Sequence, residues 1–195
     1  MTNKEIEQVA AAVFEQYVQK GNSHKNLYKV MDAEHIKFRE IHSQNARFVG
    51  ALTSSINGQY YIMVNKDIAN IGRKNFTIAH ELGHYCLKHQ LLSNLIYCCE
   101  DDVAEESQAA KSIEREANHF ASCFLMPEQK VKSAFFSMLK NSRRIASRGV
   151  FVVKKDSSFG VWRGICDELT KRYGVSEEAL RNRLRYLGLA QFYLE

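Results

Sequence analysis

The H-E-x-x-H motif at residues 80–84 constrains this chain more than any other feature of its sequence. It lies in a largely apolar run, residues 76–87, whose spacing predicts an amphipathic helix with one buried face. In such a helix, His80 and His84 lie one turn apart on the same face, where two imidazoles can share one zinc ion. Glu81 can then take a proton from a water whose pKa the zinc lowers to about 7. The motif therefore predicts a metal-dependent hydrolase with Glu81 as its general base.

A second helical segment, residues 112–127, can supply the third protein ligand that a catalytic zinc site needs. Glu114 and Asn118 lie one helical turn apart there and share a face with two alanines, so this face can pack closely against the first helix. We expect Glu114 to be the third ligand and Asn118 to hold a ligating histidine through its other ring nitrogen. Ser112 is expected to cap this helix and Pro127 to stop it.

Two other side chains of this segment compete for the role of third ligand. Glu116 points about 200° around the helix from Glu114, which favours a solvated charge or a salt-bridge partner. His119 points about 140° away from Glu114, which favours a packed or surface histidine. The remaining histidines have no spacing partner that would make them ligands: His24, His35, His42 and His89.

The two motifs together resemble a known family. The string R-x-N-F-T-I-A-H-E-L-G-H, followed by E-x-E-A-N-x-F-A-x-x-F-L-M-P, is similar to the ImmA/IrrE metallopeptidases, which belong among the gluzincins. The resemblance spans about residues 55 to 130 strongly and returns more weakly at residues 169–189. It implies one zinc ion per chain, or another divalent ion such as Mn²⁺, held by His80, His84 and Glu114.

The expected function by this resemblance is a cytoplasmic zinc endopeptidase. Its substrate would be a helix-turn-helix transcriptional repressor encoded nearby, whose cleavage derepresses mobile-element or stress genes. One alternative is a regulatory protein that binds its partner without cutting it, and another is a component of a toxin module on the same metal scaffold. The intact Glu81 argues against a purely structural metal site, which does not need a general base.

Composition agrees with a globular chain in the cytoplasm. Apolar residues make up 45% of the 195, no apolar run is long enough to cross a bilayer, and no signal peptide is visible. Five cysteines without a C-x-x-C pair disfavour a disulfide framework. We expect Cys86, Cys123 and Cys166 to be small buried side chains in helices.

The net charge of +5 is concentrated late in the chain. The basic residues concerned are Lys140, Arg143, Arg144, Arg148, Lys154, Lys155, Arg181, Arg183 and Arg185. Such a patch can bind nucleic acid, but a solvated surface is the favoured interpretation. The last two helices have the outline of a helix-turn-helix, which at these lengths is more often a plain helical hairpin.

The pattern as a whole predicts an α+β fold: a small antiparallel or mixed three-stranded sheet packed on the two motif helices, followed by C-terminal helices. The strands of the sheet are expected at residues 35–42, 46–52 and 59–65, with Asn57-Gly58 as the turn before the last. Helices are expected at residues 3–20, 112–127, 129–139, 162–173 and 177–187, the last capped by Ser176. The helix with the H-E-x-x-H motif is expected to run from about Arg73 or Asn75 to His89, and residues 149–155 are expected to be a strand or a buried run.

Two domains follow from this pattern. Residues 1–139 are expected to form a metallopeptidase-like catalytic domain, and residues 140–195 a helical extension packed on the same core. Residues 90–111 are expected to be a long connection with some helix. By the resemblance, the strand at 59–65 is expected to be the sheet edge that binds the substrate backbone as an added strand.

Overall fold

The computed structural model describes residues 1–18, 23–45, 47–89, 95–99, 108–141, 150–155 and 157–193. The chain divides into two compact units, Met1–Leu125 and Met126–Glu195. This division comes earlier in the chain than the expected boundary at residue 139. The assignment of residues 1–139 to a catalytic domain and of 140–195 to a helical extension stays a prediction about function.

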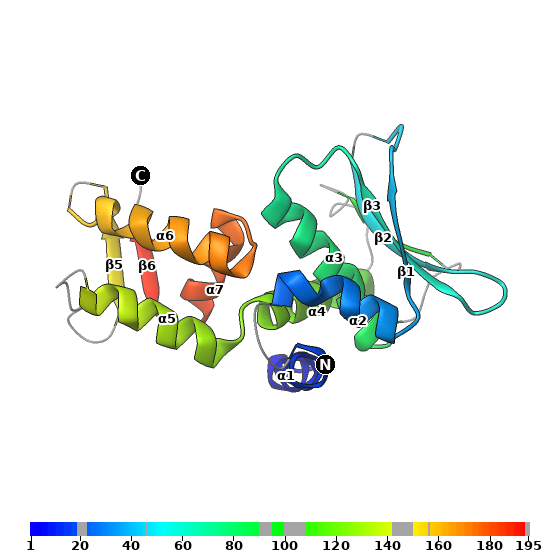
Figure 1. Cartoon of the computed structure of the whole chain (residues 1–195), viewed down its shortest axis with the longest axis horizontal. Helices are drawn as coiled ribbons and strands as arrows, with labels where there is room; N and C mark the ends of the chain where they lie inside the picture. Colours follow the sequence, from blue (N-terminus) through cyan, green and yellow to red (C-terminus); the bar gives the residue numbers. More distant parts are fainter. Residues whose placement is uncertain are drawn as a thin grey trace. The chain divides into compact units, whose positions relative to one another are not determined.

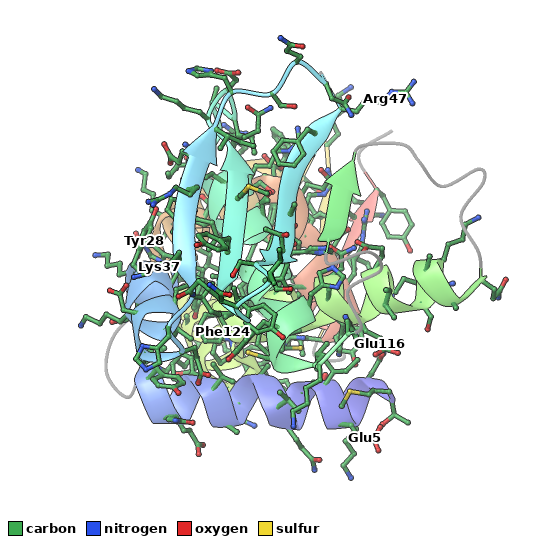
Figure 2. All side chains as sticks on the ribbon, turned by 90° about the vertical axis from the view of Figure 1, so that its right-hand side faces the viewer. Glu5, Tyr28, Lys37, Arg47, Glu116 and Phe124 are labelled. Carbon is green, nitrogen blue, oxygen red and sulfur yellow. The ribbon has the colours of Figure 1, made fainter. Side chains whose placement is uncertain are left out.

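The first unit contains a four-stranded mixed sheet in the order β1-β3-β2-β4 (Figures 1 and 2). Its strands are β1 (Lys37–Ile41), β2 (Phe48–Ser54), β3 (Tyr60–Asn65) and β4 (Leu95–Cys99). β1 runs parallel to β3, whereas β2 runs antiparallel to both β3 and β4. The turn between β2 and β3 contains Gly58, whose φ of 75° suits glycine, as the Asn57-Gly58 pair predicted.

The sequence predicted the first three strands of this sheet but missed the fourth. β4 lies in the region expected to be a connection with some helix, so the expected three-stranded sheet was one strand short. β3 pairs on both sides, with β1 and with β2, so the prediction that residues 59–65 form the substrate-binding edge is wrong. Among the described residues, the outer strands of the sheet are β1 and β4.

The helical elements of this unit are α1 (Asn3–Tyr17), the short 3₁₀ helix η1 (Ser23–Asn26), α2 (Leu27–Ala33), α3 (Ile71–Cys86) and α4 (Gln108–Leu125). α1 starts with a capping box, in which Thr2 Oγ1 accepts from the backbone N–H of Glu5 and the Glu5 carboxylate accepts from that of Thr2. α4 starts at Gln108, so the expected cap Ser112 lies inside the helix instead. Pro127 follows the end of α4, as predicted.

The core of the first unit lies between the sheet and its helices. α3 packs on β2 and β3 and also against α4, and α4 in turn packs against α1 (Figures 1 and 2). The largest fully buried side chains include Leu52, Ile62, Leu82, Phe120 and Phe124. No helix among the described residues has the length and apolar character needed to cross a membrane.

The second unit has its own core around a parallel strand pair. Its elements are α5 (Glu128–Asn141), β5 (Phe151–Lys154), α6 (Phe159–Tyr173), α7 (Glu177–Tyr186) and β6 (Ala190–Tyr193), and β5 pairs with β6. Trp162 is fully buried, with its ring edge-to-face against Phe192. Ser176 caps α7 by accepting from the N–H of Ala179, as predicted, whereas η1, α2 and β6 were not predicted.

Part of the basic patch is structural. Arg183 is only 2% exposed and donates from Nε to the backbone oxygen of Met126 at 3.1 Å. Arg181 and Arg185 both lie over the ring of Phe192. The arginines at 143, 144 and 148 fall outside the described residues, so nucleic-acid binding through this patch stays a prediction.

Candidate metal centre

The H-E-x-x-H motif lies on the buried face of α3, where its three chemical side chains are shielded from water. His80 is 3% exposed, and Glu81 and His84 are 0% exposed. α3 begins at a cap in which Asn70 Oδ1 accepts from the N–H of Arg73, and it ends at Cys86. A buried carboxylate and two buried imidazoles on one helix are costly to fold unless they interact with charged or polar partners.

Two helices bring three ligand atoms together. The Nε2 atoms of His80 and His84 lie 2.9 Å apart. Glu114, on α4, places Oε2 3.1 Å from His80 Nε2 and Oε1 3.3 Å from His84 Nε2. The three residues that the sequence predicted as ligands therefore share one locus, with ligand atoms close enough for a single ion to contact all of them.

The outer nitrogens of the two histidines fix their tautomers. Asn118 Oδ1 lies 2.9 Å from His80 Nδ1 and can only accept, so Nδ1 carries a proton, and in a neutral His80 Nε2 is then a lone pair. His84 Nδ1 lies 2.9 Å from His89 Nδ1, and His89 Nε2 faces the acceptor Glu116 Oε2 at 3.3 Å. In a neutral His89 this arrangement makes Nε2 the donor to Glu116 and Nδ1 the acceptor from His84. Both inward Nε2 atoms are then lone pairs.

This arrangement fits a cation. Two inward lone pairs and one carboxylate repel each other unless a positive charge lies between them. Burial alone would lower the pKa of His80, but the neighbouring carboxylates of Glu114 and Glu81 raise it. Burial lowers the pKa of His84 to about 4, despite the opposing effect of Glu114. Burial would raise the pKa of Glu114, yet the two histidines hold it well below its usual range.

The sequence missed the role of His89. It follows the end of α3, and Lys88 has a φ of 56°, which turns the chain back so that the N–H of His89 reaches the backbone oxygen of His84. A positive φ at a lysine has no signature in helical periodicity. The interpretation of Glu116 as a salt-bridge partner is confirmed, since it contacts His89 and also accepts from the amino group of Met1 at 2.6 Å.

Two glycines allow the close packing that forms this centre. A side chain on Gly83 would place its Cβ 3.2 Å from the backbone oxygen of Ala117, so its absence lets α3 and α4 approach closely. On β2, a Cβ at Gly50 would lie 2.6 Å from Thr77 Cγ2 and 3.0 Å from Glu81 Oε1. The strand therefore passes directly beside the predicted general base.

A comparison with known protein families identifies the family of this chain. Residues 29–185 match the IrrE N-terminal-like domain of the Peptidase M78 family. The chain belongs to this family. The match includes the H-E-x-x-H helix and the segment with Glu114 and Asn118. Membership in the IrrE-like family points to a metallopeptidase or a related regulatory protein, and the His and Glu cluster gives this member candidate metal-binding groups.

Solved structures agree on the fold. A Mycobacterium tuberculosis transcriptional regulator superposes with a TM-score of 0.53 at 16% sequence identity. The superposition covers 93% of this chain and 46% of that regulator, so this chain spans less than half of its length. Curated proteins give no significant match. At this identity the likeness concerns the fold alone.

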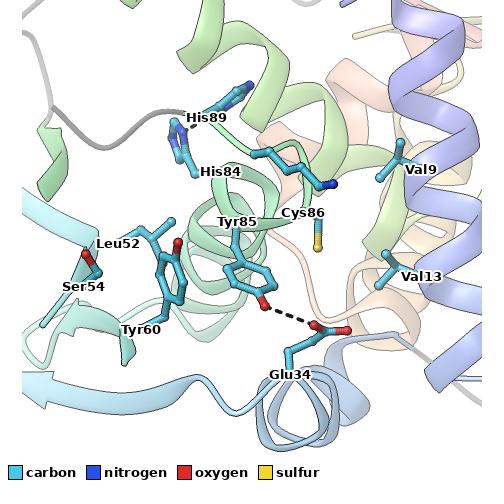
Figure 3. A pocket seen from close by; sticks show the side chains of 11 residues that line it. Val9, Val13, Glu34, Leu52, Ser54, Tyr60, His84, Tyr85, Cys86 and His89 are labelled. Carbon is cyan, nitrogen blue, oxygen red and sulfur yellow. Dashed lines mark hydrogen bonds between the residues drawn. The ribbon is translucent and has the colours of Figure 1, made fainter. Parts of the chain in front are cut away.

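A cleft of about 900 Å³ lies next to the centre of this IrrE-like chain (Figure 3). His84 and His89 line it, together with residues of α1, β2 and β3. In its wall, Tyr85 donates to Glu34 Oε2 at 3.1 Å. Tyr17 on α1 also donates to Glu34, at Oε1. Burial and the adjacent Glu34 raise the pKa of Tyr85 to about 12, so this phenol stays neutral at physiological pH.

Replacing His89 tests whether it positions His84. In His89→Ala, the Nδ1–H of His84 loses its acceptor, so the tautomer that presents Nε2 inward is no longer fixed. We expect metal affinity to fall about 10- to 100-fold, measured by competition with a chromophoric zinc chelator. His42→Ala is the matched control, because His42 is exposed and pairs with the likewise exposed Asp67. Equal zinc affinities in the two variants would show that His89 does not position His84.

Proposed function

We propose that this chain is a zinc-dependent endopeptidase that cleaves a helix-turn-helix transcriptional repressor. One observation carries the proposal: the Nε2 atoms of His80 and His84 and the carboxylate of Glu114 converge, with Glu81 buried on the same helix. Two imidazoles and one carboxylate are a common ligand set of catalytic zinc in peptidases. Zinc is favoured over Mn²⁺ because imidazole-containing sites bind it more tightly.

The chain's own residues divide the work of hydrolysis between them. Zinc, when bound, supplies a Lewis acid that acidifies water to a pKa of about 7 and polarises the scissile carbonyl. Glu81 takes a proton from the attacking water on a carboxylate oxygen and passes it to the departing amide nitrogen. Asn118 and His89 hold the Nδ1 protons, so that both Nε2 lone pairs stay directed inward.

β4 is the best candidate for the strand that pairs with the substrate backbone. Gly50 on β2 lies against Glu81, and its register partner on β4 is Cys98. Of the two outer strands in the described sheet, β4 is one strand from Gly50, whereas β1 is two strands away. A peptide added to the outer edge of β4 would need only main-chain hydrogen bonds, which suits a protein substrate in extended conformation.

The cleft beside His84 offers a place for a substrate side chain. Its wall combines the apolar Leu52, Val9 and Val13 with the polar Ser54 and the carboxylate of Glu34. A cleft with an apolar lining and a few polar groups can select one residue of a substrate next to the cleaved bond. This supports cleavage at one or a few positions rather than general degradation.

A regulatory protein that binds its partner without cutting it is the second candidate. It is supported by membership in the IrrE-like family, which points to a metallopeptidase or a related regulatory protein. The choice of a repressor as substrate rests on the family resemblance. Because such a repressor acts on DNA inside the cell, the proposal places the activity in the cytoplasm.

The test is to incubate the purified chain, with zinc added back, with the repressor encoded beside its gene. Cleavage gives shortened repressor fragments, which mass spectrometry assigns to one bond. Co-elution of an intact repressor would favour the binding-only candidate. If the experiment gives no fragments and no co-elution, the repressor is not the partner of this chain.

A further inference from the structure

A second cluster of metal-ligating side chains lies between α1 and α4, outside the centre described above. It consists of Glu7 on α1 and His119 and Cys123 on α4. Cys123 is 6% exposed, so its thiol is buried, whereas the side chain of Glu7 is 31% exposed. The sequence left His119 as a competitor for the third ligand of the first centre, but its imidazole lies at this other cluster.

The spacing within the cluster allows one ion to contact all three groups, since their ligand atoms lie within 4.8 Å of one another. His119 Nε2 lies 3.4 Å from Glu7 Oε1 and 3.6 Å from Cys123 Sγ. Tetrahedral zinc, with bonds of about 2.0–2.1 Å to nitrogen or oxygen and about 2.3 Å to sulfur, separates such atoms by about 3.4 Å and about 3.6 Å. The two measured distances are therefore compatible with shared coordination of one ion.

The cluster also repeats the arrangement of the first centre. There, His80 and His84 lie one turn apart on a helix and a glutamate comes from the neighbouring helix. Here, His119 and Cys123 lie one turn apart on α4 and Glu7 comes from α1. Side chains at this spacing share a helix face, so both pairs direct two ligand atoms at one point.

The chemistry of the three groups selects the ion. A thiolate and an imidazole favour zinc over magnesium or calcium, which prefer oxygen ligands. Glu7, the most exposed of the three, opens the cluster toward solvent, so an ion can enter and a water can complete the coordination. Binding displaces the thiol proton of Cys123 to solvent.

We propose that Glu7, His119 and Cys123 form a second zinc site, which clips α1 to α4. The contacts already present between these helices include the edge-to-face rings of Phe14 and Phe124. A metal there would tie α1 to the helix that carries Glu114 and Asn118. The proposal stands apart from the proposed peptidase function, because neither site needs the other to bind its ion.

Binding of Co²⁺ in place of zinc can detect the site at Glu7, His119 and Cys123 selectively. Thiolate-bound Co²⁺ gives an intense near-ultraviolet charge-transfer absorption, and the first centre has no thiolate among its three groups. We expect the absorption when Co²⁺ is added to the full chain, and also in a His80→Ala/His84→Ala variant. It should vanish in Cys123→Ser and need about tenfold or more Co²⁺ in Glu7→Gln, a change at a partly exposed position.

The other four cysteines provide matched controls. Cys86→Ser, Cys166→Ser and the double variant Cys98→Ser/Cys99→Ser should each keep the absorption. No absorption in the wild type, or an unchanged one in Cys123→Ser, overturns the proposal.

A thermal measurement keeps the test independent of how well Cys123→Ser folds. In the His80→Ala/His84→Ala background, zinc should raise Tm by about 5 °C, and Glu7→Gln should remove most of that rise. A rise that Glu7→Gln leaves unchanged overturns the proposal as well.

Discussion

Glu81→Gln is expected to remove peptide cleavage while the chain keeps its metal and its fold. Glutamine has nearly the same shape as glutamate, but its amide cannot take a proton from the attacking water. Loss of a general acid–base group lowers the rate by about 10²- to 10⁴-fold. The measurement is the rate of fragment formation from the repressor, with zinc content by elemental analysis on the same samples.

The position of Glu81 makes this variant informative. Its side chain is fully buried on α3, adjacent in sequence to His80 and outside the set of three converging ligand atoms. Removing its charge should therefore change proton transfer more than metal retention. Glu40→Gln is the matched control, because Glu40 pairs with Lys74 at the protein surface, and it should cleave at close to the wild-type rate. A wild-type rate in Glu81→Gln would contradict Glu81 as the general base.

Helical periodicity was enough to predict which side chains meet at the centre. The spacing of His80 and His84, and of Glu114 and Asn118, defines one face on each helix, and small residues on these faces allow close approach. The structure brings these four side chains together. Their roles as ligands and as a positioning residue stay predictions until metal binding is measured.

Contacts that depend on tertiary pairing could not be predicted in this way. The residues of β4, Leu95–Cys99, are a continuous apolar run without alternation, and they become a strand because β2 offers an edge to pair with. The family resemblance led to β3 being expected at an edge, and the sequence could not correct this because strand order is not visible in it. His89 reaches His84 because Lys88 has a positive φ, which turns the chain back after α3. The second cluster forms because α1 packs beside α4, which the sequence does not show.

Glu114→Ala is expected to remove the ion from the first centre. Two histidines alone leave the ion one protein ligand short, and the carboxylate that offsets its charge is gone. The affinity should fall by more than the 10- to 100-fold expected for a positioning residue such as His89. Isothermal titration with zinc and elemental analysis after chelator-free purification both measure this loss.

The second cluster has to be removed by substitution before the metal content of Glu114→Ala can be interpreted. If Glu7, His119 and Cys123 also hold zinc, Glu114→Ala alone takes the metal content from two ions per chain to one, which could be mistaken for a retained catalytic ion. In a Cys123→Ser background the same substitution should take the metal content from one ion per chain to none.

Glu116→Ala in that background is the matched control, because Glu116 lies on the same helix and contacts His89 rather than the inward Nε2 atoms. Zinc that stays bound in Cys123→Ser/Glu114→Ala would exclude Glu114 as a required ligand. Zinc lost equally from the Glu116 variant would show that the charge around His89, and not direct coordination by Glu114, governs binding at this centre.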